Sequence, residues 1–530
     1  MTRAPSKPLV LAVLLMASFV INLDTTLVNV ALPTLTRELG ATTAQLQWVV
    51  DAYNLVFAAL LLTSGSLSDR FGRKGMLMAG LLVFGLASFA GGYATSPAGL
   101  IAARAVMGLG AAMTFPATLS LLTGVFTSRK ERALSIGLWG ATAGMAIALG
   151  PIVGGFLLGH FSWSSIFYTL GPVSLAVIAL AARFVPRSKD PEAHGLDFPG
   201  LILSSVFMGL LVYTIIEAPG RGWASAASLL GFAGAGVALI AFIVGERRTS
   251  RPMLDVRIFA NMRFSAASAS VTIAFFTLSG FIFLMTQYFQ FVRSYSALSA
   301  GVHLLPVAVS VAVGSIAGTR LAVRLGTKVI VTAGLALQAG FYFWVAGSIT
   351  PSFGYGIIAI QMVVYGLGLG LTSAPATESI MGAVSARQAG VGSAVNDATR
   401  LLGGTLGVAV IGSVYLSLYT SRLTAALPAT LPRTLANLAG QSVGAALGVS
   451  GQLAAHGQGA AAAAVHQAAT SAFDHGLSVG CVVAAAIALA GALLAAAFLP
   501  AQPPQAPEPD HDHDHAGLPA TATHGEDLVR

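Results

Sequence analysis

Residues 65–74 read GSLSDRFGRK and concentrate charge in a chain that is otherwise mostly apolar. Only 9% of the 530 residues are charged, yet this stretch holds Asp69, Arg70, Arg73 and Lys74. An apolar run of membrane length lies on each side of it. Because an ionised side chain at the centre of a bilayer costs at least ~2.5 kcal/mol, the stretch is expected at a membrane face.

The apolar runs identify an integral membrane protein. The chain is 55% hydrophobic with a mean hydropathy of +0.79, and its runs reach roughly 20 residues, the length that crosses a bilayer as a helix. So much apolar sequence with so few charges excludes a water-soluble enzyme. Taking each run as a helix predicts an all-α protein with fourteen transmembrane segments near residues 9–33, 46–66, 76–95, 99–121, 134–157, 164–185, 198–218, 224–245, 265–290, 298–319, 327–348, 354–376, 389–417 and 475–499.

The positions of the basic residues set the predicted topology. With the amino terminus inside, nearly all Lys and Arg residues outside the helices fall on the inner side, and the outer segments hold only Arg37, Arg221, Arg293, Arg422 and Arg433. This is the bias of the positive-inside rule. Both termini are therefore predicted to be cytoplasmic. The net charge of +8 reflects this topology and implies no nucleic-acid partner.

A repeat divides the chain. The stretch LSDRFGRK at 67–74 returns in weakened form as LAVRLGTK at 321–328, an offset of 254 residues. Each copy follows an even-numbered helix, so the copies are parallel repeats, as expected for two six-helix halves. The prediction is an N-terminal six-helix bundle at 1–187, an inserted two-helix segment at 188–262 and a C-terminal six-helix bundle at 263–500.

Two segments fall outside this plan. An outer loop at 418–474 is rich in Ala and Gly, and it is expected either to form short amphipathic helices or to be mobile. The tail at 501–530 carries DHDHDH at 510–515, where alternating Asp and His can bind zinc or nickel, but a disordered cytoplasmic tail is the preferred interpretation. With Cys481 as the one cysteine, no disulfide within the chain and no cysteine-based metal site are expected, and no metal is assigned to the protein.

Acidic residues inside the apolar runs are candidate functional groups, since burying a charge is costly unless the site uses it. At 1.5 Å per residue, Asp24, Asp51 and Arg104 share one level in the outer half of the membrane and can form a cluster that loads and releases a proton. The alternatives are a permanent ion pair of Asp24 with Arg104, and an Asp51 that faces outer water. Asp397 and Arg400 lie three residues apart, so they either satisfy each other or take part in coupling.

The fifth predicted helix has a pattern of small residues, which consists of Gly140, Gly144, Gly150, Pro151, Gly154 and Gly155. Small residues let helices approach closely, and Gly150 followed by Pro151 removes a backbone hydrogen bond and favours a kink. The pattern fits a gating helix, or a helix that is only tightly packed.

Five stretches together resemble a known family. GSLSDRFGRK resembles the cytoplasmic loop signature of the major facilitator superfamily. Four others resemble helix signatures of the fourteen-helix drug:proton antiporters, of the multidrug efflux type, within that superfamily. They are INLDTTLVNVALP at 21–33, WVVDAYNL at 48–55, LIAARAVMGLGAA at 100–112 and GATAGMAIALGPIVGG at 140–155, in the first, second, fourth and fifth helices.

The resemblance implies roles for individual residues. Asp24 and Arg104 are implied to take part in proton coupling and cation recognition, and Gly150 and Pro151 to shape the antiporter interface. The implied cytoplasmic gate, held closed by the aspartate and the first arginine, consists of Gly65, Asp69, Arg70, Gly72 and Arg73. Val323 stands in the second copy of the repeat where Asp69 stands in the first, so a matching gate contact is not expected there.

The sequence thus predicts a proton-coupled efflux antiporter in the plasma (inner) membrane of a prokaryote. We expect a monomer that exports lipophilic, cationic small molecules by rocker-switch alternation, with the proton gradient as energy source and no cofactor. No acidic residue lies between Asp255 and Glu378, which favours monocationic or neutral substrates. The predicted cavity residues are Tyr53, Asn54, Gln287, Tyr288 and Gln361. The alternatives are an exporter of one endogenous metabolite or lipid, and a non-transporting membrane sensor or scaffold.

Neutralising Asp69, for example by Asp69→Asn, is expected to impair the conformational cycle while leaving substrate binding largely intact, because the gate lies away from the midplane cavity. Dye efflux from vesicles and equilibrium dye binding measure the two effects separately. Equal losses of binding and transport would contradict the gate assignment.

Overall fold

The computed structural model describes residues 6–126, 128–189, 197–249, 252, 254–348, 354–384 and 389–501. Within these ranges it describes the backbone alone at residues 62, 66, 69, 129, 130, 132–134, 136, 137, 143, 147, 389–391, 393 and 394. The tail at 502–530, with its alternating Asp and His residues, lies outside the described residues.

Helices account for every regular element in the described ranges, and fourteen helical spans are long and apolar enough to cross a membrane. This confirms the prediction of an all-α membrane protein. The earlier helices are α1 (Lys7–Leu39), α2 (Thr43–Phe71), α3 (Arg73–Gly92), α4 (Pro97–Val125), α5 (Arg129–His160), α6 (Ser164–Phe184), α7 (Phe198–Arg221) and α8 (Ala226–Arg248). The later ones are η1 (Val256–Ala260), α9 (Met262–Gln287), η2 (Tyr288–Val292), α10 (Ala297–His303), α11 (Leu305–Leu325), α12 (Thr327–Ser348), α13 (Tyr355–Met381), α14 (Ala389–Ala426), α15 (Arg433–Gln441), α16 (Val443–Ala455) and α17 (Gly459–Phe498).

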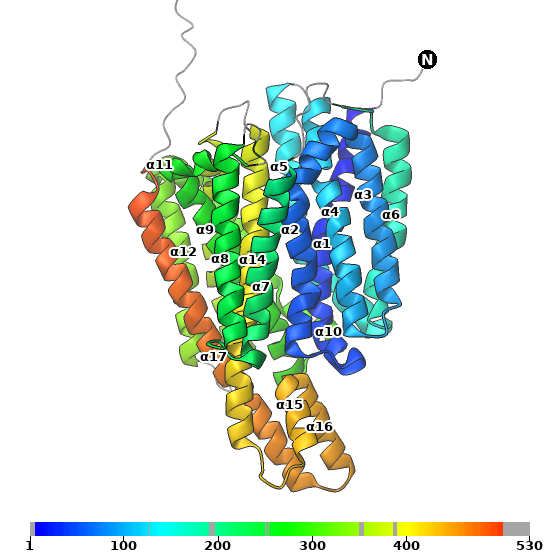
Figure 1. Ribbon diagram of the computed structural model, residues 1–530, viewed down its shortest axis with the longest axis vertical. Helices are drawn as coiled ribbons and strands as arrows, with labels where there is room; N and C mark the ends of the chain where they lie inside the picture. Colours follow the sequence, from blue (N-terminus) through cyan, green and yellow to red (C-terminus); the bar gives the residue numbers. More distant parts are fainter. Residues whose placement is uncertain are drawn as a thin grey trace, which may run out of the picture.

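The long helices pack into two groups that stand side by side (Figure 1). In the first half, α1 packs on α5, α2 on α4, and α3 on α4 and α6. In the second half, α9 packs on α14, α11 on α13, and α12 on α13 and α17, so the same pairs recur in the same order. The inserted α7 packs on α8 and also contacts α2 and α14, one helix from each half. The expected domain limits at residues 187 and 263 stay a prediction.

The repeated stretch forms the same tight turn twice. α2 continues to Phe71 and α3 begins at Arg73, so the expected charged loop narrows to a single residue, Gly72, with a φ of +112°. Gly326, at the matching position between α11 and α12, has a φ of +87°. Glycine adopts this backbone region without a steric penalty, which explains why both copies keep it.

A helical cap extends from one end of the bundle (Figure 1). It comprises residues 418–474, where α14 continues to its end, α15 and α16 follow, and α17 begins. Both α14 and α17 run further than the apolar runs indicated, because the segment is rich in Ala, the strongest helix former. We call this end of the bundle the cap face, and the opposite end, where α1 begins, the amino-terminal face.

The cap is continuous with the second half but touches the first. The Thr43 hydroxyl donates to the Gln441 carbonyl oxygen over 3.1 Å. Gly444 packs against Thr36 and the Phe291 ring, and a Cβ added there would lie 2.6 Å from that ring. The absence of a side chain at Gly444 therefore lets the cap lie over the corner between α1 and α2.

Close glycine contacts hold α3 and α4 together. A Cβ at Gly110 would lie 2.5 Å from the Phe84 backbone nitrogen, so Gly110→Ala must push the two helices apart. Overpacking of this kind costs roughly 1–3 kcal/mol, and the midpoint of thermal unfolding in detergent is expected to fall. Gly236→Ala in α8 is the control, because nothing lies within 4 Å of a Cβ added there. Equal midpoints for the two variants would contradict this packing.

Candidate functional site

A cavity of ≈190 Å³ lies between the two halves. Its walls come from α1, α2, α4 and α5 of the first half and from α9 and α14 of the second. The polar and charged residues on it are Asn22, Thr25, Thr26, Asn29, Asn54, Arg104, Ser279, Asp397 and Arg400. The large aromatic residues on it are Phe57, Phe115, Trp139 and Phe275. The cavity therefore offers aromatic surface, amide groups and charges of both signs.

A buried ion pair joins α1 and α4, and its arginine, Arg104, lines the cavity. Arg104 Nη1 lies 2.5 Å from Asp24 Oδ2, and the two side chains are 1% and 0% exposed. Arg104 Nε donates to the Val49 carbonyl oxygen over 2.9 Å, and its Cζ lies 4.3 Å from the centroid of the Tyr53 ring. Asp24 Oδ1 is buried without a hydrogen-bond partner among the described residues. One carboxylate oxygen thus remains for a proton or another donor.

Polar side chains of α1 face the cavity at helical spacing. Asn22, Thr25 and Asn29 lie three and four residues apart, so they share one face of the helix. Asn22 Nδ2 donates to the Ser18 carbonyl oxygen over 2.9 Å, and Asn29 Nδ2 donates to the Thr25 carbonyl oxygen over 2.6 Å. This spacing is a signal in the sequence that the prediction, centred on charged residues, did not use.

An aromatic wall runs along the first half. Phe57 of α2, Phe115 of α4 and Trp139 of α5 contact one another in turn, with ring centroids 5.7 and 4.7 Å apart. Trp139 Nε1 donates to the Thr118 hydroxyl over 2.9 Å, which fixes the indole. Such a wall binds flat apolar groups and, through the faces of its rings, cations. The prediction missed these residues because an aromatic residue in an apolar run carries no sign of the direction it faces.

Asp397 and Arg400 of α14 form the charged part of the opposite wall. Asp397 Oδ1 accepts from Asn396 Nδ2 over 3.4 Å, whereas Arg400 Nη2 donates to the Thr377 hydroxyl over 3.0 Å. Arg400 Cζ also lies 5.2 Å from the centroid of the Phe275 ring. In the part of the chain that the structure describes, no ion pair joins Asp397 and Arg400. Of the two alternatives for these residues, the direct ion pair is thus not seen, and a part in coupling stays a prediction.

Asp51 lies apart from the ion pair. Its side chain is 0% exposed, and neither carboxylate oxygen has a hydrogen-bond partner among the described residues. One turn away, Gln47 Nε2 donates to the carbonyl oxygens of Val408 and Ala409 of α14 over 3.2 and 3.0 Å. Asp51 is thus neither a member of a cluster with Arg104 nor open to water. The residue count gives the position of Asp51 along the helix, but it could not give the rotation of the helix.

The five residues predicted to line the cavity are spread over several places. Asn54 lies on the cavity. Tyr53 instead donates through its hydroxyl to a backbone carbonyl of α1 over 3.2 Å. Tyr288 and Gln361 line a smaller apolar pocket inside the second half, and Gln287 donates to a carbonyl of its own helix. Of the five, Asn54 alone therefore lies on this cavity, because one sequence does not show which way a buried helix faces.

The glycine pattern of α5 has two parts. The part nearer the cap face packs tightly against α1 and α10 and consists of Gly150, Pro151, Gly154 and Gly155. The other part consists of Gly140 and Gly144, which are exposed and have no atom within 4 Å of an added Cβ. Gly140 also lines the cavity. Close packing therefore describes the first part, and the second borders open space.

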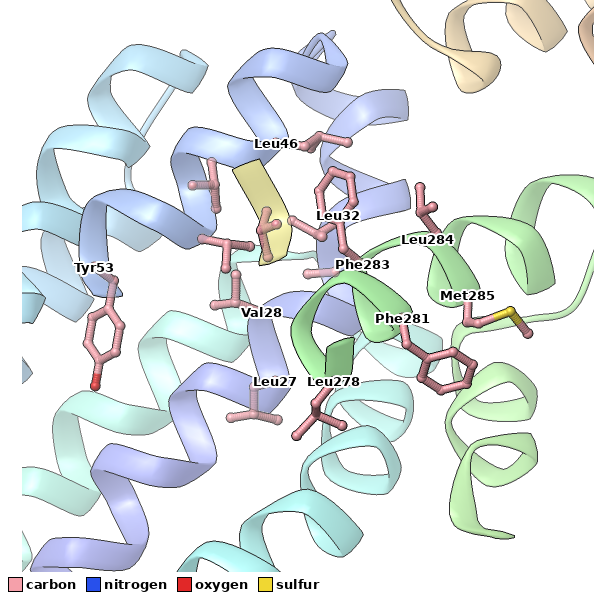
Figure 2. Packing of buried hydrophobic residues seen from close by; sticks show 14 of the residues in the cluster. Leu27, Val28, Leu32, Leu46, Tyr53, Leu278, Phe281, Phe283, Leu284 and Met285 are labelled. Carbon is pink, nitrogen blue, oxygen red and sulfur yellow. The ribbon is translucent and has the colours of Figure 1, made fainter. Parts of the chain in front are cut away.

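Contacts between the halves gather toward the cap face. Gln290 Nε2 of η2 donates to the Val30 carbonyl oxygen of α1 over 3.0 Å. Figure 2 shows buried apolar side chains of α1 and α9, among them Leu32 and Phe283, which belong to one cluster where the two helices pack together. Together with the bonds from Gln47 to α14 and the contact of the cap with α1 and α2, these interactions close the cavity toward the cap face.

The predicted gate residues lie at the amino-terminal face. The Arg73 backbone nitrogen donates to the Ser188 carbonyl oxygen over 2.9 Å, and Arg73 Nη1 donates to the Ser188 hydroxyl over 3.3 Å. Arg70 is exposed, and Gly65 lies inside α2 rather than in a turn. The Asp69 side chain lies outside the described residues, so its role with Arg70 stays a prediction.

These features define an α-helical transport protein with two related halves around a central cavity. The family model of the Major Facilitator Superfamily matches residues 14–408, and the chain belongs to this superfamily. The multidrug resistance protein Stp of Mycobacterium tuberculosis is 36% identical over 397 residues, which cover 75% of this chain and 73% of Stp. The methyl viologen resistance protein SmvA of Salmonella typhimurium is 36% identical over 414 residues, which cover 76% of this chain and 81% of SmvA.

Two further comparisons extend this result. The multidrug efflux pump LfrA of Mycolicibacterium smegmatis is 34% identical over 415 residues, which cover 78% of this chain and 82% of LfrA. The inward-facing crystal structure of a bacterial homolog to the human lysosomal transporter Spinster matches with a TM-score of 0.63 and 18% identity, covering 94% of this chain and 98% of that chain. At this identity the likeness shows the fold alone. The resemblance found in the sequence is thus confirmed, and the protein is a multi-span membrane transporter.

Replacing Arg104 is expected to lower the stability of the protein more than replacing Arg400. Arg104→Gln leaves Asp24 buried without its partner, and breaking a buried pair in this way costs roughly 3–5 kcal/mol. The yield of folded protein and its unfolding midpoint in detergent are expected to drop strongly. Arg400→Gln is the control, because it makes the same chemical change at a half-buried residue outside any ion pair of the described chain. Similar losses in both variants would contradict the structural role of the pair.

Proposed function

We propose that the protein is a proton-coupled efflux antiporter that exports lipophilic, monocationic or neutral small molecules across the plasma membrane of a prokaryote. The observation that carries the proposal is the buried pair of Asp24 and Arg104, in which Arg104 lines the cavity and Asp24 lies behind it. The superfamily supplies transport as the activity. The similarity to resistance proteins for multiple drugs and for methyl viologen supports drug efflux.

Asp24 is the residue that we assign to proton coupling. Arg104 holds its Oδ2, and its Oδ1 has no partner among the described residues, so the carboxylate can still accept a proton. Protonation removes the negative charge and weakens the attraction to Arg104, whereas ionised Asp24 favours a positive charge nearby. A carboxylate that interacts with either a proton or a cationic cargo couples the export of the cargo to the entry of protons. Asp397 and Arg400, on the opposite wall, are the second pair of charges that such an exchange can use.

The walls of the cavity support the cargo class. The rings of Phe57, Phe115 and Trp139 offer a continuous apolar face that also attracts cations. The second half contributes Asp397 to the cavity, and α9 to α12 contain no acidic residue. Few carboxylates around one cavity suit a cargo with one positive charge or none, because each buried charge needs a partner.

The amino-terminal face is cytoplasmic in this proposal, because it carries the basic residues Arg70, Arg73 and Lys74. Both termini then lie in the cytoplasm, the cap lies outside, and the contacts at the cap face close the outer side. The monomer alternates by rocking residues 1–187 against residues 263–500 around the cavity.

Asp24→Asn is expected to abolish dye efflux driven by a pH gradient in inverted membrane vesicles, because an amide cannot exchange a proton. Dye binding to the purified variant reports whether the cavity persists. Glu217→Gln is the control, since this acid lies at the end of α7 in a pair with Arg221 and should not affect efflux.

Two results would contradict the proposal. Unchanged pH-driven efflux in Asp24→Asn would remove the coupling role. Failure of wild-type proteoliposomes to move any compound of a panel of dyes and drugs, with a proton gradient imposed, would overturn drug efflux itself.

A further inference from the structure

We propose that Asp51 is a second proton-binding site, whose protonation lets α2 and α14 close the cap face of the transporter. The proposal rests on the proposed function for the alternation of the two halves. It gives a role to a buried acid that does not line the cavity and that the coupling by Asp24 leaves unused.

Asp51 is buried without compensation. Its side chain is 0% exposed, and both of its oxygens lack a hydrogen-bond partner among the described residues. An ionised carboxylate without a partner is strongly disfavoured in apolar surroundings, whereas the protonated form carries no net charge. The closed conformation therefore favours a proton on Asp51.

The position of Asp51 ties this proton to the contact between the halves. Helical spacing places it between Gln47, which bonds the backbone of α14, and Trp48, whose ring centroid lies 6.1 Å from that of Tyr213 of α7. α14 runs antiparallel to α2. One turn further from the cap face than Val408 and Ala409, the residue of α14 on the side of α2 is therefore Thr405. The Thr405 side chain is 0% exposed, and its hydroxyl also has no partner among the described residues. Two unpaired polar groups thus lie at one level of the seam.

The charges on the helices that pack against α2 belong to other sites. None of them bonds to an oxygen of Asp51. They are Lys7, Asp24, Arg37 and Glu38 on α1, Arg104 on α4, Arg73 and Lys74 on α3, Glu217 and Arg221 on α7, and Asp397, Arg400 and Arg422 on α14, with Arg70 on α2 itself and Tyr53, Tyr213, Tyr415 and Tyr419 as titratable neighbours on α2, α7 and α14. The proton on Asp51 therefore depends chiefly on whether water reaches the seam.

Closure and protonation are then linked. When the halves separate at the cap face, water enters the seam and Asp51 can ionise. When they close, the carboxyl takes up a proton from the outer side before it is buried. The closed state binds one more proton at this residue than the open state, so a lower outer pH favours closure, and closure in turn favours protonation.

The test measures opening of the cap face without any cargo. Glu38→Cys at the end of α1 and Asn437→Cys in α15 are both exposed positions, and spin labels on them report the distance between the first half and the cap. Cys481→Ala removes the buried native thiol from this background. In otherwise wild-type protein, the fraction of long distances is expected to rise several-fold between about pH 5 and about pH 8.

The variants separate a titrating role from a packing role. Asp51→Asn keeps nearly the same shape but cannot ionise, so the short distance should persist at every pH. Asp51→Glu keeps a carboxyl group and should restore a pH-dependent distance. Glu217→Gln is the control and should behave as the wild type does.

The same pH-dependent opening in Asp51→Asn as in the wild type would overturn the proposal, and so would a wild-type distance that does not change with pH. Because the measurement needs neither cargo nor a gradient, either result would leave the coupling by Asp24 standing. Normal pH-driven efflux by Asp24→Asn would instead overturn the proposed function and leave these distances valid.

Discussion

A charge buried in a membrane must find its partner inside the protein, and the bond between Asp24 and Arg104 meets this requirement where α1 and α4 meet. The same guanidinium also bonds the Val49 carbonyl oxygen and faces the Tyr53 ring, both of α2. One side chain therefore joins three helices of the first half. Because these helices form most of one cavity wall, the shape of that wall and its charge depend on the same bond.

Close helix packing is the second constraint, and it repeats between the halves. Gly80 of α3 faces Gly110 of α4, and Gly334 of α12 faces Gly368 of α13; a Cβ on any of them would lie 2.7 or 2.8 Å from the carbonyl oxygen of the facing glycine. Gly334 follows Gly80 by 254 residues, the offset of the repeated turn. The repeat that the sequence shows as four matching residues in a stretch of eight is thus also a repeat of contacts.

Some of these features could be predicted from the sequence because they depend on counting. Run length predicts the membrane helices, and the rarity of charge in apolar runs singles out Asp24 and Arg104. The position of Asp51 along α2 also follows from a count, but its neighbours follow from the rotation of α2, which packing decides. Phe115 and Trp139 were missed for the same reason. The helices of the cap were left open because a segment rich in Ala and Gly fits both a helix and a mobile loop.

The cap is joined to the bundle by helices that do not break at the membrane. α17 has 40 residues, so at 1.5 Å per residue it is about 60 Å long. Because α17 is one continuous helix, a tilt of about 10° about one end moves the other end by about 10 Å, the diameter of a helix. A small rotation of the second half becomes a large displacement of the surface of the cap. A binding protein raised against one position of the cap would therefore select one conformation of a cavity that it never touches.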